Sequence, residues 1–230
     1  MRALVSTLLL LGACTHAEGQ PRGPEGPVIL ELFTSQGCSS CPPADRLLAK
    51  LATGPHVAAL SFHVDYWNDL GWADPYSQAA WTERQHHYAR ALGDARVYTP
   101  ELVVGGVVGI VGSNTSQVQA AIGKTPRPAL LAAAASWTKD SLEVTTTAPT
   151  DAEVLVAVWE SERTVKVTRG ENIGKALSNA RIVRRLERVA TAGKQGTITV
   201  KLDPAWHDVG AVVFAQRSDQ RIVASAMLPR

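Results

Sequence analysis

Apolar runs and amphipathic segments alternate along the first half of the chain. Residues 28–33 form an apolar run bounded by glycine, proline and serine, which predicts a buried strand. The segment that opens at Pro42 carries leucines on one face and closes at Gly54, which predicts a helix. Similar patterns predict a strand at 57–64, a helix at 77–92, short strands around 105–106 and a helix at 114–122. The expected order from residue 28 is therefore β-α-β-α-β-β-α.

The hydrophobic pattern changes after residue 123. Residues 124–128 hold two prolines and predict a linker. Beyond the linker, short apolar runs predict strands at 142–147, 154–160, 181–189, 197–202, 209–216 and 222–227. Strands at this spacing favour a β-sandwich. Because the order of the first half is that of the thioredoxin fold, we expect an α/β thioredoxin-like domain at 28–123, followed by a smaller β-rich, sandwich-like domain at 129–230.

The N-terminal residues have the composition of an export signal. Arg2 precedes an apolar stretch, 3–11, that is too short to span a bilayer but is typical of a signal peptide. Residues 11–14 resemble a bacterial lipobox, which predicts a signal peptide at 1–14, lipidation of Cys14 and a flexible tether at 15–27. Ordinary cleavage near Ala13 is the alternative. Either way, we expect an exported protein, periplasmic or lipid-anchored in the bacterial cell envelope.

Charge and later hydropathy exclude two classes of partner. The chain has 230 residues and a net charge of +2, and its lysines and arginines are not clustered, so we expect no nucleic-acid partner. No later apolar run reaches the roughly 18 residues that a membrane span needs. Contact with a membrane is therefore expected only through the N-terminal lipid.

The chemistry is expected at the pair Cys38-Ser39-Ser40-Cys41, since the third cysteine, Cys14, is accounted for by the signal. The pair lies where the first strand turns into the first helix, and a helix N-terminus stabilises a thiolate. We therefore expect Cys38 to be the nucleophile and Cys41 to resolve the mixed disulfide, with Ser39 and Ser40 beside them and no cofactor.

Thr99-Pro100 is expected to lie opposite the dithiol. A cis proline before the third strand is a feature of thioredoxin-fold proteins, and Thr99-Pro100 stands immediately before the run 101–104. The backbone of Thr99 would then be free to pair with an extended substrate. An ordinary trans proline at the start of a strand is the alternative.

Further polar and aromatic residues are candidates for supporting roles. Glu31, on the first strand, could relay the proton of Cys41 or could instead be ion-paired. In a strand-helix-strand unit the two parallel strands end at the same edge of the sheet. The residues expected near Cys38 at that edge are His63, Asp65, Tyr66 and Trp67.

The segment 31–45, ELFTSQGCSSCPPAD, resembles the signature of a bacterial secreted thioredoxin-like family of unknown function. Further blocks that resemble this family lie at 62–67, 71–75, 82–85, 98–100 and 169–174. Two positions depart from its pattern, Asn68 for a usual aspartate and Ser178 for a usual histidine. The resemblance implies the fold and the export but no activity. The polar turn 169–172 could fold over the dithiol or be a plain surface turn.

Three functions are open at this point. The sequence favours a cell-envelope thiol-disulfide oxidoreductase that acts on protein or small-molecule thiols and disulfides, with an unidentified redox partner. A copper-binding protein, with Cys38, Cys41 and His63 as ligands, is the alternative, because soft sulfur ligands suit Cu(I). A non-catalytic binding module is the third, although a disulfide closing so short a loop would add little stability.

Overall fold

The computed structural model describes residues 23–230. The helices are α1 (Pro42–Leu51), α2 (Ala79–Leu92), α3 (Thr115–Lys124) and the short 3-10 helix η1 (Asn68–Leu70). The strands are β1 (Val28–Thr34), β2 (Val57–His63), β3 (Glu101–Val104), β4 (Val108–Val111), β5 (Ala129–Leu130), β6 (Ala133–Trp137), β7 (Ser141–Thr147), β8 (Glu153–Lys166), β9 (Ala176–Ala190), β10 (Gln195–Lys201), β11 (Val209–Gln216) and β12 (Ile222–Leu228). The expected signal peptide, the lipidation of Cys14 and most of the expected tether lie outside the described residues.

One mixed sheet joins the two halves of the chain. Its nine strands run in the order β4-β3-β1-β2-β9-β8-β11-β12-β5. The junction is the parallel pairing of β2 with β9 at Ser61 and Ile182. Strands make up 42% of the described residues and helices 18%. The predicted fold class, an α/β thioredoxin-like domain followed by a smaller sandwich-like domain, is therefore wrong: the protein is mostly β, and one large mixed sheet runs through both halves.

The error has a physical origin at the edge of β2. An edge strand presents unpaired N–H and C=O groups, and β9 covers that edge of β2. β9 comes more than a hundred residues later in the sequence, and its hydrophobic pattern does not indicate which strand it pairs with. The period of a strand predicts which face is buried and leaves the order of strands in a sheet open.

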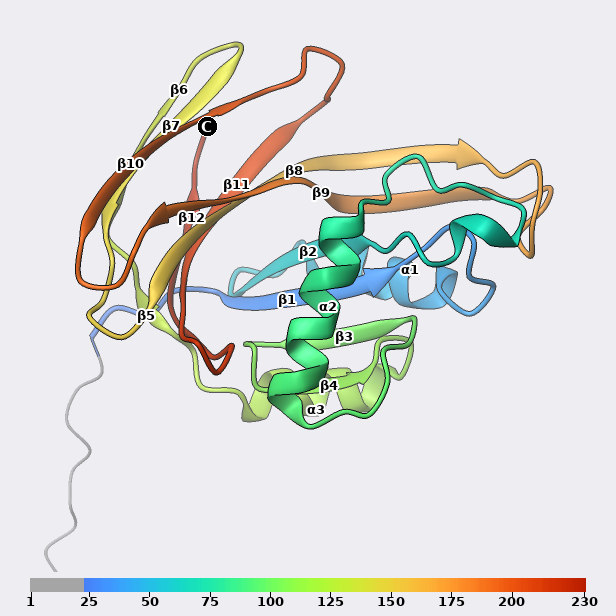
Figure 1. Cartoon of the computed structure of the whole chain (residues 1–230), viewed down its shortest axis with the longest axis horizontal. Coiled ribbons are helices and arrows are strands. Elements are labelled where there is room, and N and C mark those ends of the chain that lie inside the picture. Colours follow the sequence, from blue (N-terminus) through green and yellow to red (C-terminus); the bar gives the residue numbers. More distant parts are fainter. Residues whose placement is uncertain (1–22) are drawn as a thin grey trace, which may run out of the picture.

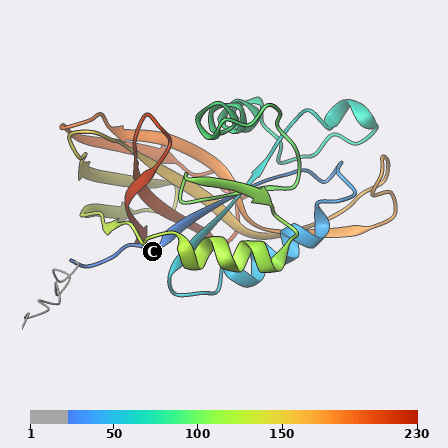
Figure 2. The same ribbon diagram turned by 90° about the horizontal axis from the view of Figure 1, so that it is seen from below.

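Helices cover both faces of the first half of the sheet (Figure 1). Helix α2 lies on one face, and α1 and α3 lie together on the other, as the turned view shows (Figure 2). β1 is buried along its whole length because alternate side chains enter the two cores. Phe33 packs in the core under α2, and Leu32 packs in the core under α1 and α3. This double burial explains why β1 reads as a continuous apolar run.

The second half of the chain packs sheet against sheet. The strands β10, β7 and β6 form a separate three-stranded sheet, whose inner residues, such as Leu142 and Val144, share a core with β8, β11 and β12. β8 and β9 are much longer than predicted and pair as far as Lys166 and Ala176. Their hairpin extends beyond the sandwich to the edge where the loops after β1 and β2 lie (Figure 1). It thereby carries residues 167–175 to that edge.

Within residues 23–230, no helix is long and apolar enough to cross a membrane.

Candidate active site

The two cysteines of the motif lie between β1 and α1. Cys41 is the N-cap residue of α1, and the helix begins at Pro42, which has no N–H to bond back into the turn. Both cysteines are in the thiol form and buried, with Cys38 1% and Cys41 0% exposed. The residues between them, Ser39 and Ser40, are exposed. The motif thus forms a tight turn that holds both sulfur atoms inward.

The expected cis peptide bond is present between Thr99 and Pro100. The Cys38 thiol donates a weak hydrogen bond to the Thr99 carbonyl oxygen, with a sulfur–oxygen distance of 3.8 Å. The indole N–H of Trp67 donates to the Thr99 hydroxyl over 2.8 Å. Because that hydroxyl accepts from Trp67, its own proton is free to point elsewhere. Thr99, Pro100 and Trp67 are therefore brought to the dithiol, as the sequence led us to expect.

Several hydrogen bonds stabilise the ionised form of Cys38. The hydrogen bond from the Cys41 side chain contributes most, and burial opposes it. The Thr99 hydroxyl and the backbone N–H groups of Ser40 and Cys41 add to the effect and lower the pKa of Cys38 to about 7. At neutral pH a substantial share of Cys38 is then a thiolate, which is the reactive form of a cysteine.

Cys41 has the opposite environment. Burial, then the hydrogen bond with Cys38 and the charges of Cys38 and Asp45, raise the pKa of the Cys41 thiol far above its usual range. The Thr34 hydroxyl lies within hydrogen-bonding reach of the Cys41 sulfur, and it donates to Asp45 Oδ1 over 2.8 Å. Burial also raises the pKa of Asp45 to about 6. A buried carboxyl group that titrates near neutral pH therefore lies one hydroxyl away from Cys41.

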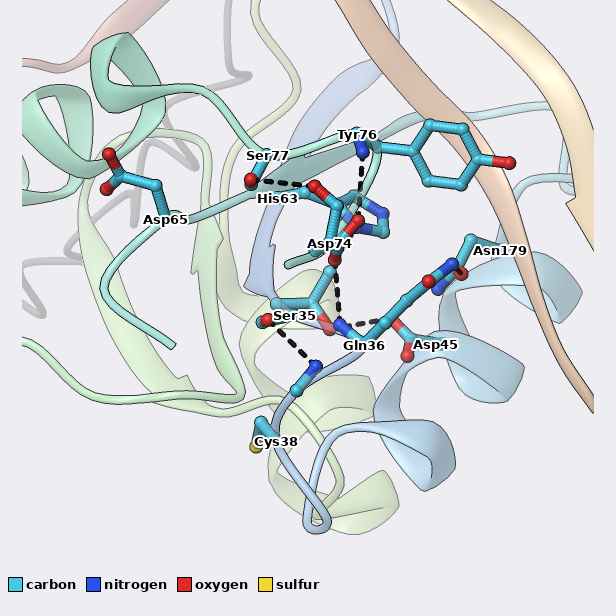
Figure 3. A network of polar contacts seen from close by, with 12 residues as sticks. Ser35, Gln36, Cys38, Asp45, His63, Asp65, Asp74, Tyr76, Ser77 and Asn179 are labelled. Carbon is cyan, nitrogen blue, oxygen red and sulfur yellow. Dashed lines mark hydrogen bonds and ion pairs between the residues drawn. The ribbon is translucent and has the colours of Figure 1, made fainter. Parts of the chain in front are cut away.

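A buried ion pair lies behind this carboxyl group. His63 Nδ1 and Asp74 Oδ2 are 2.7 Å apart and both side chains are inaccessible to solvent. Asp74 Oδ2 also accepts from the backbone N–H of Gln36 over 2.7 Å, which ties the pair to the loop before the motif (Figure 3). Burial disfavours the imidazolium, but the charge and hydrogen bond of Asp74, with the charge of Asp45, outweigh it and raise the pKa of His63.

Glu31 and Asp65 are engaged elsewhere. Arg84 of α2 holds both oxygens of Glu31, with nitrogen–oxygen distances of 2.5 and 2.8 Å, and the Tyr88 hydroxyl donates to Glu31 as well. Asp65 Oδ1 accepts from the Thr82 hydroxyl, and Figure 3 shows Asp65 apart from the network around His63. Two roles were open for Glu31, a proton relay to Cys41 and an ion pair, and the structure shows the ion pair.

Tyr66 faces α2. Its hydroxyl donates to Gln85 Oε1 over 3.2 Å, and Gln85 in turn donates to the carbonyl oxygen of Tyr98 and to Glu101. Burial raises the pKa of Tyr66 above its usual range. Tyr66 is 37% exposed, so it forms part of the surface beside Thr99.

The tip of the β8–β9 hairpin, residues 167–175, contacts the motif. The Asn172 side chain is buried and donates to the carbonyl oxygens of Gln36 and Cys38, both over 2.9 Å. The Ser39 N–H donates to Glu171 Oε2 over 3.0 Å. The turn at 169–172, for which the sequence left two readings, therefore packs against the dithiol loop.

The residues proposed as copper ligands do not form a metal cluster. In the part of the chain that the structure describes, no three or more His, Cys, Asp or Glu side chains are grouped so that they could hold an ion. His63 uses Nδ1 for Asp74, and its Nε2 has no hydrogen-bond partner among residues 23–230. The trio of Cys38, Cys41 and His63 is thus unsupported as a metal site.

An open groove of about 890 Å³ lies elsewhere, between α2 and the ends of β8, β9 and β11. Four of its charged side chains form two ion pairs: Arg217 pairs with Asp151 over 2.6 Å, and Arg188 pairs with Glu153 over 3.4 Å. Around the dithiol, by contrast, Cys38, Cys41, Asp45 and His63 all have shifted pKa values and lie together, and we place the site there.

Residues 29–216 match the family described as Protein of unknown function (DUF1223). The chain belongs to this family. The DUF1223 match confirms the expected membership of a family of unknown function. No curated protein has a sequence that matches the chain.

Two solved structures resemble this DUF1223 protein. One is the crystal structure of a protein from Agrobacterium tumefaciens, which is 30% identical, covers 90% of this chain and 96% of its own, and has a TM-score of 0.70. The other is HBP35 of Porphyromonas gingivalis, which is 14% identical, covers 90% of this chain and 76% of its own, and has a TM-score of 0.60. The second likeness concerns the fold alone.

Sequence reasoning missed much of the polar network of this DUF1223 site. Thr34, Asp45 and Asp74 were not predicted to take part in the site. One signal was available, because Asp45 stands four residues after Cys41 on the face that α1 buries. The position of Asp74 depends on a long loop after β2, which no local pattern specifies.

Proposed function

We propose that this protein is a thiol-disulfide oxidoreductase that works through Cys38 and Cys41. The observation that carries the proposal is the divergence of the two thiols: the pKa of Cys38 is lowered to about 7, whereas that of Cys41 is raised. One sulfur is then an available nucleophile at neutral pH and the other remains protonated until it is needed. A purely structural pair would need no such difference.

In the first step, the Cys38 thiolate attacks one sulfur of a substrate disulfide. A bond forms between Cys38 and that sulfur, the substrate disulfide breaks, and the other substrate sulfur leaves as a thiolate. Thr99 and the N–H groups of Ser40 and Cys41 hold Cys38 ionised before the attack. Because Cys38 is only 1% exposed, a substrate reaches the sulfur after the surrounding loops have moved.

In the second step, Cys41 resolves the mixed disulfide. Once Cys38 is bonded to the substrate it carries no charge, so one cause of the raised pKa of Cys41 is gone. Cys41 passes its proton by way of the Thr34 hydroxyl to Asp45 and attacks Cys38. The Cys38–Cys41 disulfide forms, and the second substrate sulfur leaves as a thiolate. The substrate has gained two electrons and the dithiol has lost two.

The reaction can run in either direction, depending on the redox partner that regenerates the pair. Protein and small-molecule disulfides or thiols both fit this chemistry. The signal-peptide pattern at residues 1–14 favours the bacterial cell envelope as the place of action.

The proposal is tested on the full chain with single cysteine variants. The purified protein is equilibrated in glutathione redox buffers, free thiols are tagged with a maleimide, and the fraction of disulfide is measured. We expect Cys38→Ser to abolish disulfide exchange and Cys41→Ser to trap a mixed disulfide on Cys38. Cys14→Ser removes the remaining cysteine of the chain and serves as the matched control, with exchange unchanged.

Two results would refute the proposal. Exchange that persists in Cys38→Ser would mean that the dithiol is not the reacting group. A pair that stays wholly reduced, or wholly oxidised, across the accessible range of glutathione potentials would mean that it does not cycle.

A further inference from the structure

The tip of the β8–β9 hairpin is held against the dithiol loop by a fully satisfied amide. Asn172 Nδ2 uses its two protons on the carbonyl oxygens of Gln36 and Cys38. Its Oδ1 accepts from the Lys175 ammonium over 2.9 Å. With each donor and acceptor of the side chain engaged, the amide can have only one orientation. The tip therefore has a fixed position relative to Cys38.

This position places the Glu171 carboxylate beside the nucleophile. Its Oε2 accepts the Ser39 N–H over 3.0 Å, and Ser39 is the residue that follows Cys38. The hydrogen bonds from the Ser39 hydroxyl and N–H lower the pKa of Glu171, so the side chain is ionised at neutral pH. A negative charge thus lies next to the sulfur that a substrate must approach.

The N–H groups of the turn are divided between the cysteine and the carboxylate. Those of Ser40 and Cys41 lower the pKa of Cys38, and that of Cys41 also bonds to the Cys38 carbonyl oxygen over 3.3 Å, whereas that of Ser39 bonds to Glu171. The thiolate and the carboxylate therefore share the donors of one short turn. A carboxylate that only decorated the surface would not take part in this division.

We propose that Glu171 is a specificity-determining residue of the dithiol site, which disfavours anionic disulfides and favours cationic ones. Its action on substrates rests on the proposed oxidoreductase function, whereas its position beside Cys38 does not. A charge on the substrate that comes to about 6 Å from the Glu171 carboxylate interacts with it only weakly through water. For each unit of charge removed from residue 171, we therefore expect the rate with an anionic reagent, relative to a neutral one, to change about threefold.

Several other charged groups near Cys38 are engaged by partners of their own, while Arg169 on the same tip is exposed. From α1, Asp45 acts on Cys41 and is buried. His63 at the end of β2 and Asp74 on the loop after it neutralise each other. On the hairpin tip, Lys175 is held by Asn172. Glu171 is the exposed carboxylate that is hydrogen-bonded to the cysteine turn. A change of its charge therefore acts on a reagent that approaches Cys38 from the solvent.

The first test uses alkylating probes and does not depend on disulfide exchange. Cys38 is alkylated in the full chain with neutral iodoacetamide and with anionic iodoacetate, and the modified residue is identified by peptide mass. We expect the ratio of the iodoacetate rate to the iodoacetamide rate to rise about threefold in Glu171→Gln and about tenfold in Glu171→Lys. The ratio cancels any change in how often the loops open or in the share of thiolate.

The control variant is Glu162→Gln. Glu162 is an exposed glutamate on β8 of the same hairpin, so its replacement removes the same charge from a different place. Its ratio should equal that of the unmodified protein. A ratio that does not move in either Glu171 variant, or that moves as far in the control, overturns the assignment.

The second test compares exchange with cystamine, a dication, and with glutathione disulfide, an anion. We expect the preference for cystamine to fall in Glu171→Gln and to reverse in Glu171→Lys, and an unchanged preference overturns the specificity role. If the alkylation ratio changes while no variant exchanges either disulfide, the oxidoreductase proposal fails and the specificity role falls with it. The placement of Glu171 beside Cys38 would survive that result.

Discussion

The Thr34 hydroxyl donates a hydrogen bond to Asp45 Oδ1 over 2.8 Å, and both side chains are buried behind Cys41. Thr34 ends β1 and Asp45 lies in the first turn of α1, so the contact joins the two elements that present the motif. The hydroxyl can accept from one neighbour while it donates to another, which is what a proton relay requires.

The first prediction concerns the rate of resolution. Asp45→Asn keeps the size of the side chain and an acceptor for Thr34 but cannot take a proton. We expect the second step to slow by roughly 10²-fold or more, with the first step unchanged, because general base catalysis is lost. Rapid-quench trapping of the mixed disulfide measures this: it should accumulate in Asp45→Asn. Equal rates of resolution in the two proteins would rule out Asp45 as the acceptor.

The second prediction concerns stability and pH. The pKa of Asp45 is raised to about 6 by burial, above its ordinary value, so the folded protein binds this proton more tightly than the unfolded chain does. The stability that this group contributes is present below about pH 4 and is lost as pH rises through about 6. At pH 7 we expect Asp45→Asn to be more stable than the unmodified protein by roughly 2 kcal/mol, with little difference at pH 4.

Denaturant unfolding at several pH values measures that difference. Asp140→Asn is the control, since Asp140 is exposed in a turn and its replacement should leave the free energy of unfolding nearly unchanged at both pH values. A variant that is less stable at pH 7 than at pH 4, relative to the unmodified protein, would contradict the sign of the argument.

The third prediction separates Glu31 from the chemistry. Glu31→Gln leaves the buried Arg84 guanidinium without its counter-charge, so we expect a loss of about 3–5 kcal/mol in the free energy of unfolding. The exchange rate per folded molecule should not change. The double variant Glu31→Leu with Arg84→Met should cost less than Glu31→Gln, because no charge is left unpaired. A lower exchange rate in fully folded Glu31→Gln would contradict this prediction and indicate that Glu31 takes part in proton transfer.

The fourth prediction concerns the Thr99 hydroxyl. Thr99→Val removes the hydroxyl that accepts from Trp67 and stabilises the Cys38 thiolate. We expect the pKa of Cys38 to rise by about half a unit to one unit, so that alkylation at neutral pH slows. The ultraviolet absorbance of the thiolate followed against pH gives the pKa directly. Thr99→Ser retains the hydroxyl and should restore the original value, and a pKa that is equal in all three proteins would disprove the contribution.

The fifth prediction concerns the hairpin tip. Asn172→Ala removes the side-chain donor of two buried carbonyl oxygens, of which that of Cys38 keeps the Cys41 N–H, and this should cost about 1–3 kcal/mol. Asn172→Asp should cost more, because it turns a carboxylate oxygen toward those carbonyl groups. Ile173→Asp, at the exposed neighbouring position, adds the same charge and should change the free energy of unfolding by less than about 0.5 kcal/mol. Equal costs for the two aspartate variants would deny that Asn172 holds the tip.

Local patterns were sufficient for the elements around the dithiol. The apolar run at 28–33, the prolines that open α1 and the Thr99-Pro100 pair each depend on neighbours a few residues away, and the structure has the strand, the helix and the cis bond at these places. Pairings over long sequence distances were not readable. The bridge between Ser61 and Ile182, which makes one sheet of two expected domains, depends on strand edges and not on hydrophobic period.

The candidate site divides in the same way. Cys38 and Cys41 are visible in the sequence because their spacing carries the chemistry. Asp74 and Asn172 are not, because each acts through a contact with the motif loop from a distant segment. Glu31 is the opposite case: its place on an apolar strand drew attention to it as an acid, whereas the charge serves Arg84.

Asn172 follows Cys38 by 134 residues, so its two hydrogen bonds to the motif loop form only some time after that loop has been synthesised. A ribosome adds roughly 5–20 residues per second, so Cys38 and Cys41 are synthesised roughly 7–27 seconds before the hairpin tip that covers their loop. Throughout this interval the nascent cysteines have no Asn172 to restrain their turn and no Glu171 to repel anions. In the newly synthesised chain the thiols therefore distinguish least between anionic and cationic disulfides. The selectivity of the finished protein is acquired only when nearly three quarters of the chain has been made.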